Sequence, residues 1–285
     1  MDPRPIGMFD SGFGGLTVAR ALIDLLPGED LVYLGDTARY PYGPRPLDEV
    51  RGFAHQITER LIEHHDVKLV IVACNTASAA ALGELQAEAP VPVVGVIEPG
   101  VRSLVSATRN GHVGVIGTVG TIGSGAYQAA VAEAHPGVKL ACAACPGFVE
   151  FVERGETGTD QVHVLAERLL APLVEAEIDT LLLGCTHYPF LARTISDVMG
   201  REVVLHVRQA PGPEVDGEVG VAVADQVAAA RALAGRVAAG AAEHGEAQPG
   251  GQPHATLLTW SSSGPRRRRP RRRKTSTSPD DSKVC

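Results

Sequence analysis

The sequence predicts an α/β protein with two similar, pseudo-symmetric lobes and mostly parallel sheets. Short apolar runs rich in Val, Ile and Leu alternate with amphipathic stretches over residues 6–206, the order expected of parallel strands joined by helices. The runs are dense rather than strictly alternating, which is typical of strands buried on both faces. Residues 6–98 and 112–206 each hold four such runs, and this weak repeat predicts two lobes that face each other across a cleft.

The expected strands are PIGMFD, DLVYLGD, KLVIVAC and VPVVGVIE in the first half, and HVGVIGT, VKLACAACP, DTLLLGC and EVVLHV in the second. Helices are expected at 15–26, 46–64, 76–88, 123–134, 159–176 and 188–199. The pattern is clearest in 46–64, where Val50, Ala54, Ile57 and Leu61 recur at helical spacing. The first strand of each half opens into a Gly-rich turn, FDSGFGG at 9–15 or IGTVGTIGSG at 116–125.

The end of the chain has a different composition. We assign residues 1–98 plus about 208–240 to the first lobe and 99–207 to the second. Residues 241–285 are rich in Pro, Gly, Ser and Arg, and we predict that they are disordered. A shifted reading frame, native or introduced, would produce such an abrupt change, whereas the run RRRRPRRRK could instead be a polyanion-binding tail.

Charge and composition narrow the possible partners and the compartment. The net charge is −7, and residues 261–285 carry nine Lys+Arg against two Asp+Glu, so the remainder carries −7 − 7 = −14. An acidic body argues against nucleic acid as the main partner, apart from weak binding by the tail. No apolar run reaches the length of a membrane span, and no secretory signal is visible. Five Cys without a dense framework suggest a reducing compartment, so we expect a cytoplasmic protein.

Two cysteines stand in nearly the same local setting. VIVACNTASA at 70–79 and LLLGCTHYPF at 181–190 each carry an apolar run, then Cys, then a nearby Thr. Ligands in open α/β sheets bind at the carboxyl ends of strands. We expect the backbone N–H groups and the helix dipole there to lower the pKa of both thiols. Cys74 and Cys185 would then serve two faces of one stereocentre, although both could instead be small buried hydrophobes.

The motifs that surround these cysteines closely resemble those of the glutamate racemase group in the aspartate/glutamate racemase family. The matching segments are IGMFDSGFGGLTV, YLGDTARYPYGPR, VACNTASA, VIEPG, GVIGTVGTI, ACPGFVEFVERG and DTLLLGCTHYPFL, in the family's order over about residues 6–206. The resemblance implies cofactor-independent interconversion of L- and D-glutamate, which supplies D-glutamate for peptidoglycan. It also implies one catalytic Cys for each face of the substrate Cα.

The same resemblance implies the remaining site residues. Catalytic roles fall on Cys74 and Cys185, on Asp10 beside the first Cys, on His187 as the acid–base partner of the second, and on Glu153 near it. Substrate contacts fall on Asp10, Ser11, Tyr42, Gly43, Asn75, Thr76, Thr118, Thr121, Thr186 and His187. Each type also has an ordinary structural explanation, such as a helix cap for Asp10 and Ser11 or a Pro-Gly turn at Tyr42 and Gly43.

We expect no cofactor and no metal. A pyridoxal enzyme needs a Schiff-base Lys, but Lys274 and Lys283 lie in the tail, and Lys68 and Lys139 sit just before strands. Cys142 and Cys145 form CAAC without a second pair at metal spacing, so we interpret them as structural. The expected partner is glutamate, and we expect a homodimer.

Two alternatives remain at this point. The family's later motifs cannot be found after Val204, and the segment that carries them normally completes the first lobe. The chain could therefore be a racemase for aspartate or a hydantoin, or a non-catalytic binding protein that kept the fold.

Overall fold

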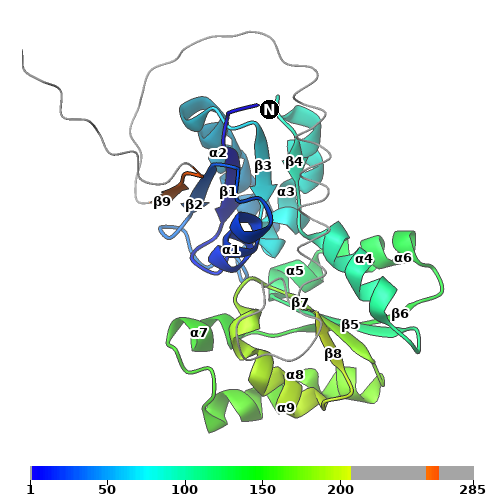
Figure 1. Cartoon of the computed structure of the whole chain (residues 1–285). Coiled ribbons are helices and arrows are strands. Elements are labelled where there is room, and N and C mark those ends of the chain that lie inside the picture. The colour runs from blue at the N-terminus through cyan, green and yellow to red at the C-terminus, as the bar shows by residue number, and fades with distance from the viewer. Residues whose placement is uncertain (1, 207–254, 263–285) are drawn as a thin grey trace, which may run out of the picture.

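The computed structural model describes residues 2–206 and 255–262, and its elements form two lobes that each contain one sheet (Figure 1). The first sheet holds β1 (Ile6–Asp10), β2 (Leu31–Gly35), β3 (Leu69–Val72), β4 (Val93–Val94) and β9 (Thr256–Trp260). The second holds β5 (His112–Gly117), β6 (Lys139–Ala144), β7 (Thr180–Gly184) and β8 (Val204–His206). All pairs are parallel except β2–β9, so the predicted fold class is confirmed.

The repeat seen in the sequence is a repeat of topology. The first sheet has the order β4-β3-β1-β2-β9 and the second β6-β5-β7-β8. The four parallel strands of each half can be numbered 1 to 4 in chain order. Across the sheet they then lie in the order 2-1-3-4 in both halves, with the first sheet read from β2 to β4. In the first sheet, β2 lies on one side of β1 and β3 on the other, so the strand order reverses between β1 and β3. In the second sheet, β6 and β7 flank β5 in the same way, so the order reverses between β5 and β7. Such a reversal is the position at which doubly wound sheets bind ligands.

Helices cover both faces of each sheet, as the apolar strands require. The first lobe carries α1 (Leu16–Leu25), α2 (Leu47–His65) and α3 (Asn75–Glu88). The second carries α4 (Ile97–Ala107), α5 (Val119–Gly123), α6 (Ala126–Ala134), α7 (Phe148–Glu153), α8 (Asp160–Glu175), the 3-10 turn η1 (Tyr188–Leu191) and α9 (Ala192–Met199). Alternation along β1 shows the layering, because Met8 packs with α1 and Phe9 packs with α2 and α3.

Several elements differ from the sequence prediction. The expected strand at 91–98 shortens to two residues of β4, because α4 begins at Ile97 with Pro99 in its first turn, where proline is tolerated. The short helix α7 was not predicted. The helix expected at 123–134 is split by Gly125, whose φ of 74° is left-handed, and the one at 188–199 begins as a 3-10 turn.

Strand β9 corrects the prediction of disorder for part of 241–285. Residues Thr256–Trp260 pair antiparallel with β2, from Leu31 opposite Trp260 to Gly35 opposite Thr256. Thr, Leu and Trp favour a strand, and β2 would otherwise present unpaired backbone groups at the sheet edge. The proposed first-lobe segment 208–240 and the Arg run lie outside the described residues.

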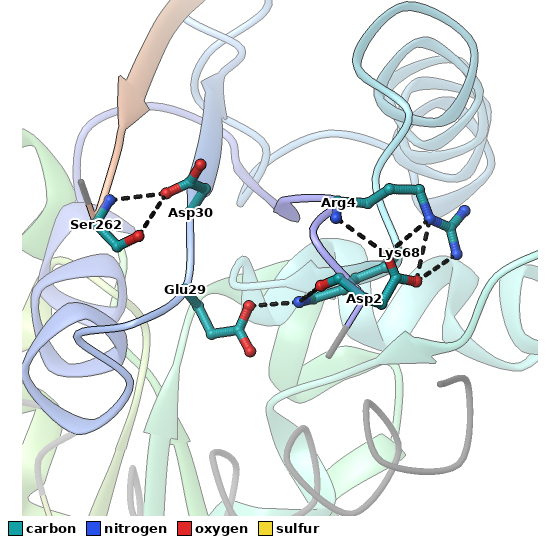
Figure 2. Close-up of polar contacts among 6 residues, drawn as sticks. All are labelled: Asp2, Arg4, Glu29, Asp30, Lys68 and Ser262. Carbon is teal, nitrogen blue, oxygen red and sulfur yellow. Dashed lines mark hydrogen bonds and ion pairs between the residues drawn. The ribbon is translucent and has the colours of Figure 1, made fainter. Parts of the chain in front are cut away.

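Two groups of polar contacts, together called the polar network, lie at the end of the first lobe at which the parallel strands begin (Figure 2). The Lys68 ammonium, buried just before β3, donates to the backbone oxygen of Asp2 at 2.9 Å and to the Glu29 carboxylate. Asp2 in turn pairs with Arg4 at 2.7 Å. Ser262, just after β9, donates from its N–H and its hydroxyl to Asp30 Oδ1 at 2.7 and 3.0 Å. The polar network connects the amino-terminal segment and Ser262 to the rest of the first lobe.

Candidate active site

Each sheet places one cysteine at its point of strand reversal. Cys74 follows β3 and immediately precedes α3, while Cys185 follows β7. The neighbours β1 and β5 end at Asp10 and just before Thr118. Each Cys therefore lies at the carboxyl end of a central strand of its own lobe. Both of these strand ends face the boundary between the lobes.

Both cysteines line one narrow cleft between the lobes. Its walls hold nine of the residues expected from the sequence: Ser11, Tyr42, Gly43, Cys74, Asn75, Thr76, Thr118, Cys185 and Thr186, with His187 as a tenth. The site is enclosed, since Cys74 and Cys185 are only 5% and 7% exposed.

The expected lowering of the two thiol pKa values is wrong for this closed arrangement. Burial raises the pKa of Cys74 to about 12, and the nearby Asp10 carboxylate adds to the effect. The predicted donors do exist, because the Ala77 N–H and the Ser11 hydroxyl and N–H favour the Cys74 thiolate. Loss of water around the sulfur outweighs them, since desolvation disfavours the charged form.

Cys185 follows the same balance. Burial raises its pKa well above the ordinary value, whereas the backbone N–H groups of His187 and Tyr188 act in the opposite direction. Charges on Cys74 and Asp10 raise the pKa of Cys185 further. The two thiols are thus near enough for a thiolate at one to disfavour a thiolate at the other.

His187 connects Cys185 to a carboxylate. Its Nδ1 lies 3.9 Å from Cys185 Sγ, and its Nε2 lies 2.8 Å from Glu153 Oε1. The imidazole is buried whereas the Glu153 side chain is 39% exposed. Glu153 does not itself line the cleft, and it reaches His187 from the last residue of α7. A carboxylate that accepts a hydrogen bond from one ring nitrogen fixes the orientation of the imidazole and leaves the other nitrogen facing the thiol.

Asp10 lies behind the cleft rather than on its wall and is fully buried. Its Oδ2 accepts hydrogen bonds from the N–H groups of Gly12 and Gly15, both at 3.1 Å. Its Oδ1 accepts a hydrogen bond from the Thr186 hydroxyl at 3.3 Å, across the lobe boundary. The carboxylate therefore organises the turn after β1 and raises the pKa of both thiols.

Three threonine hydroxyls form a triangle between the lobes. Thr76 Oγ1 lies 3.1 Å from Thr118 Oγ1 and 3.0 Å from Thr121 Oγ1, and the last two lie 2.9 Å apart. Thr118 also caps α5 by accepting from the Thr121 N–H at 3.2 Å. Thr121 is fully buried behind Thr118 and does not reach the cleft surface, unlike the other two.

The remaining expected residues are held by polar contacts from behind. The Tyr42 hydroxyl donates to the buried Asp36 carboxylate, which also accepts from Arg39 Nε at 2.6 Å. The Tyr127 hydroxyl donates to Asn75 Oδ1 at 2.6 Å. Within the described residues, the buried Asn75 Nδ2 has no hydrogen-bond partner, so it can donate a hydrogen bond to a ligand in the cleft.

Sequence reasoning missed three residues of the cleft wall, Tyr40, Pro41 and Val149. Tyr40 packs on His187 with ring centroids 5.9 Å apart. Tyr40 and Pro41 lay within the YPYG motif and could have been included on that signal. Val149 belongs to α7 and lies within the segment ACPGFVEFVERG, but its residue type did not distinguish it from the neighbouring apolar residues.

No group of three potential metal ligands occurs among residues 2–206 and 255–262. In the same ranges, no helix has the length and apolar character needed to cross a membrane. Lys68 and Lys139 lie at the beginnings of β3 and β6, at the opposite ends of these strands from the cleft. The Lys68 ammonium is bound by Glu29 and Asp2.

Comparisons with known proteins point in one direction. The family described as Asp/Glu/Hydantoin racemase matches residues 14–210. A glutamate racemase from Parafrankia sp. is 56% identical over 205 residues, which are 72% of this chain and 74% of that protein. The structure of a glutamate racemase isoform from Bacillus anthracis aligns with a TM-score of 0.73 at 38% identity, covering 83% of each chain. A Francisella tularensis glutamate racemase in complex with D-glutamate aligns with a TM-score of 0.71 at 34% identity, covering 83% of this chain and 84% of that one.

Proposed function

The chain belongs to the Asp/Glu/Hydantoin racemase family, and we propose that within this family it interconverts L- and D-glutamate with two cysteines as its acid and base. The observation that carries the proposal is the equivalent placement of Cys74 and Cys185 at the strand reversals of two sheets that share one cleft. A racemase must remove a proton from one face of Cα and return one to the other. Two thiols on opposite lobes supply these two faces.

The reaction needs one thiolate and one thiol at a time. The thiolate takes the Cα proton, the electron pair passes into the adjacent carboxylate, and the other thiol returns a proton to the opposite face. The mutual effect of the thiols on their pKa values favours this singly deprotonated state over a double thiolate. Running the reaction in reverse exchanges the two roles.

Burial makes each thiol a weak acid, so each needs help to lose its proton. His187 takes up the Cys185 proton and is held for this by Glu153. In the first lobe, the Asp10 carboxylate lies near Cys74, but its two oxygens already accept hydrogen bonds from Gly12, Gly15 and Thr186. Asp10 accordingly acts by its charge and by positioning the loop that carries Ser11, and the Ser11 donors support the Cys74 thiolate.

Substrate carboxylates meet donors from both lobes. The amino terminus of the 14-residue α3 offers N–H groups and a positive dipole end at Asn75 and Thr76. Asn75 Nδ2, which has no partner among the described residues, gains one when a carboxylate enters. Gly43, Ser11 and Thr186 add backbone and hydroxyl donors from the cleft wall. Donors to the carboxylate next to Cα stabilise the charge that develops there during proton removal.

No cofactor is part of this proposal. The lysines of the described chain stand at the wrong strand ends for a Schiff base in the cleft. The acidity of Cα–H then has to come from desolvation and from fixed donors.

The deciding experiment incubates dialysed, chelator-treated protein with each enantiomer of glutamate, aspartate and a hydantoin, and follows optical rotation and solvent deuterium at Cα. We expect racemisation and exchange with glutamate only. Racemisation of aspartate or a hydantoin in preference to glutamate would reassign the substrate. Glutamate binding without exchange would identify a binding protein, and activity that appears only with pyridoxal phosphate would contradict the two-thiol mechanism.

The cellular setting is proposed from the same resemblance. D-glutamate from this reaction serves peptidoglycan synthesis in the cytoplasm, and the enzyme is a homodimer. Sedimentation of the purified chain tests the dimer, and D-glutamate auxotrophy on depletion tests the pathway. Weak nucleic-acid binding by the Arg run is tested by heparin retention at low salt, which should fall when residues 263–285 are removed.

A further inference from the structure

Tyr127 touches the immediate neighbours of both proposed catalytic cysteines. Its hydroxyl donates a 2.6 Å hydrogen bond to Asn75 Oδ1, and Asn75 directly follows Cys74. Its ring packs on Gly184, which directly precedes Cys185, because a Cβ on Gly184 would lie 3.1 Å from Tyr127 Cε2 and 3.2 Å from its Oη. Tyr127 is fully buried and comes from α6 of the second lobe, so its bond to Asn75 crosses the lobe boundary.

In this structure the Tyr127 hydroxyl pairs with the oxygen end of the Asn75 amide. The two ends of an Asn side chain have nearly the same shape, and only their hydrogen bonds distinguish oxygen from nitrogen. The Tyr127 hydroxyl occupies the oxygen end, and Nδ2 is left buried without a partner among the described residues. A buried amide without a partner is costly, and Asn75 lines the cleft. An anionic ligand in the cleft can accept the hydrogen bond that this amide nitrogen lacks.

We propose that Tyr127 is a positioning residue, which holds Asn75 in the one amide orientation that presents a donor to a carboxylate of the bound amino acid. The inference rests on the proposed function, because it gives the bound ligand a carboxylate next to Asn75. Tyr127 itself touches neither the ligand nor the reacting atoms. It also gives the second lobe a direct influence on a binding group of the first, since the bond exists only when the lobes are together.

The test is Tyr127→Phe, which keeps the ring on Gly184 and removes only the hydroxyl. We expect the KM for both enantiomers to rise about tenfold, the loss expected for one directed hydrogen bond to a charged group, with kcat changed less than about twofold. Thr194→Val is the matched control, since Thr194 is buried, lies outside the cleft wall and donates from its hydroxyl to the Thr157 carbonyl at 2.7 Å. It should lose similar stability and keep its KM.

A double-mutant cycle separates positioning from general support of the core. If Tyr127 acts through Asn75, Tyr127→Phe adds nothing to the higher KM of Asn75→Ala, or to its higher Kd for glutamate by calorimetry if that variant is inactive. Additive effects, or an unchanged KM in Tyr127→Phe, would overturn the inference. Asn75→Asp keeps an acceptor for the hydroxyl but loses the donor. It should fold like the parent and bind glutamate more weakly, and parental affinity in this variant would overturn the inference even if Tyr127→Phe failed to fold.

The two proposals fail in different ways. A parent chain that neither racemises nor binds glutamate overturns the proposed function and this inference together. A parent that racemises normally beside a Tyr127→Phe variant with an unchanged KM overturns only the role of Tyr127.

Discussion

The backbone N–H of Gly120 donates a 2.9 Å hydrogen bond to the carbonyl oxygen of Gly43, so that the two lobes meet main chain to main chain beside the cleft. A Cβ at Gly120 would lie 2.9 Å from that oxygen and 3.3 Å from Thr76 Cγ2. Glycine is needed here for close approach rather than for an unusual φ. The contact sets how closely the Tyr42–Gly43 loop approaches α5.

Gly120→Ala should therefore separate the lobes locally and lower kcat/KM at least tenfold, because small displacements of binding groups are costly for catalysis. Gly83→Ala in α3 is the matched control. A Cβ there meets nothing within 4 Å, and alanine inside a helix stabilises by about 0.5–1 kcal/mol. Kinetics and thermal melts of both variants check this, and a Gly120→Ala enzyme with parental kinetics would contradict the closure argument.

Removal of either thiol should stop racemisation, because each variant loses the acid or base on one face of Cα. Cys74→Ala and Cys185→Ala should each retain solvent deuterium exchange with only one enantiomer, and with opposite enantiomers. Mass spectrometry of each glutamate enantiomer in D₂O measures this. A variant that racemises at the parental rate, or two variants that exchange the same enantiomer, would rule out the two-base arrangement.

Glu153→Gln should lower kcat about 10- to 100-fold while leaving KM nearly unchanged, since general acid–base assistance contributes on this scale or more. The carboxamide can still reach His187 Nε2, which lies 2.8 Å from the carboxylate in the parent, but it has no negative charge to balance a proton that the imidazole takes from Cys185. Glu150→Gln is the control on the same helix, because Glu150 is exposed and lies outside the cleft wall. Equal kcat values for the two variants would show that Glu153 plays no part in proton transfer.

The sequence predicted the eight strands of residues 6–206 because each contains a short apolar run, although β6 and β8 are only partly buried in the structure. It also located Cys74 and Cys185 correctly at strand ends, since that placement depends only on local order along the chain. Strand β9 was missed because its five residues lie in a segment of low complexity. Its pairing with β2 depends on a free sheet edge more than 200 residues earlier in the chain.

The sequence could not predict the direction of the thiol pKa shifts. The donors around Cys74 are local and were anticipated, whereas its burial depends on packing with residues distant along the chain, such as Phe9 in the same core cluster. Tyr127 shows the same difficulty, since it lies 52 residues from Asn75 along the chain. Contacts of this kind become visible only when both lobes are in place.

Folding stability should fall as the pH rises above about 9. Burial raises the pKa of Cys74 and Cys145 from an ordinary 9.0 to about 12, so the folded state keeps protons that the unfolded chain releases. This contribution is fully present below pH 9.0 and is lost as the pH rises toward 12. Thermal melts at pH 7.5 and 10.5 measure the loss, and Cys145→Ala should reduce it. A melting temperature that does not change over this interval would contradict the burial argument.

Strand β9 adds an antiparallel edge to the first sheet through its pairing with β2 (Figure 1). Its side chains contribute little burial, since Leu257, Leu258 and Trp260 are 44%, 44% and 51% exposed. Its stabilising effect then comes from the backbone ladder and from polar contacts, which include the two hydrogen bonds of Ser262 to Asp30 (Figure 2) and a 3.4 Å contact between the hydroxyls of Thr37 and Thr256.

A chain that ends at His254 should therefore be less stable than one that ends at Ser262, by about 1–2 kcal/mol for a few net hydrogen bonds. For a chain of this size, the melting temperature should fall by about 2–8 °C. Asp30→Ala in the longer chain removes the Ser262 contacts but keeps the backbone ladder of β9, and it should give a smaller decrease. The cleft lies at the opposite end of β1 and β3 from the polar network, so kcat/KM should be similar in the two truncated chains at 25 °C. Equal melting temperatures would mean that β9 does not pair with β2 in solution.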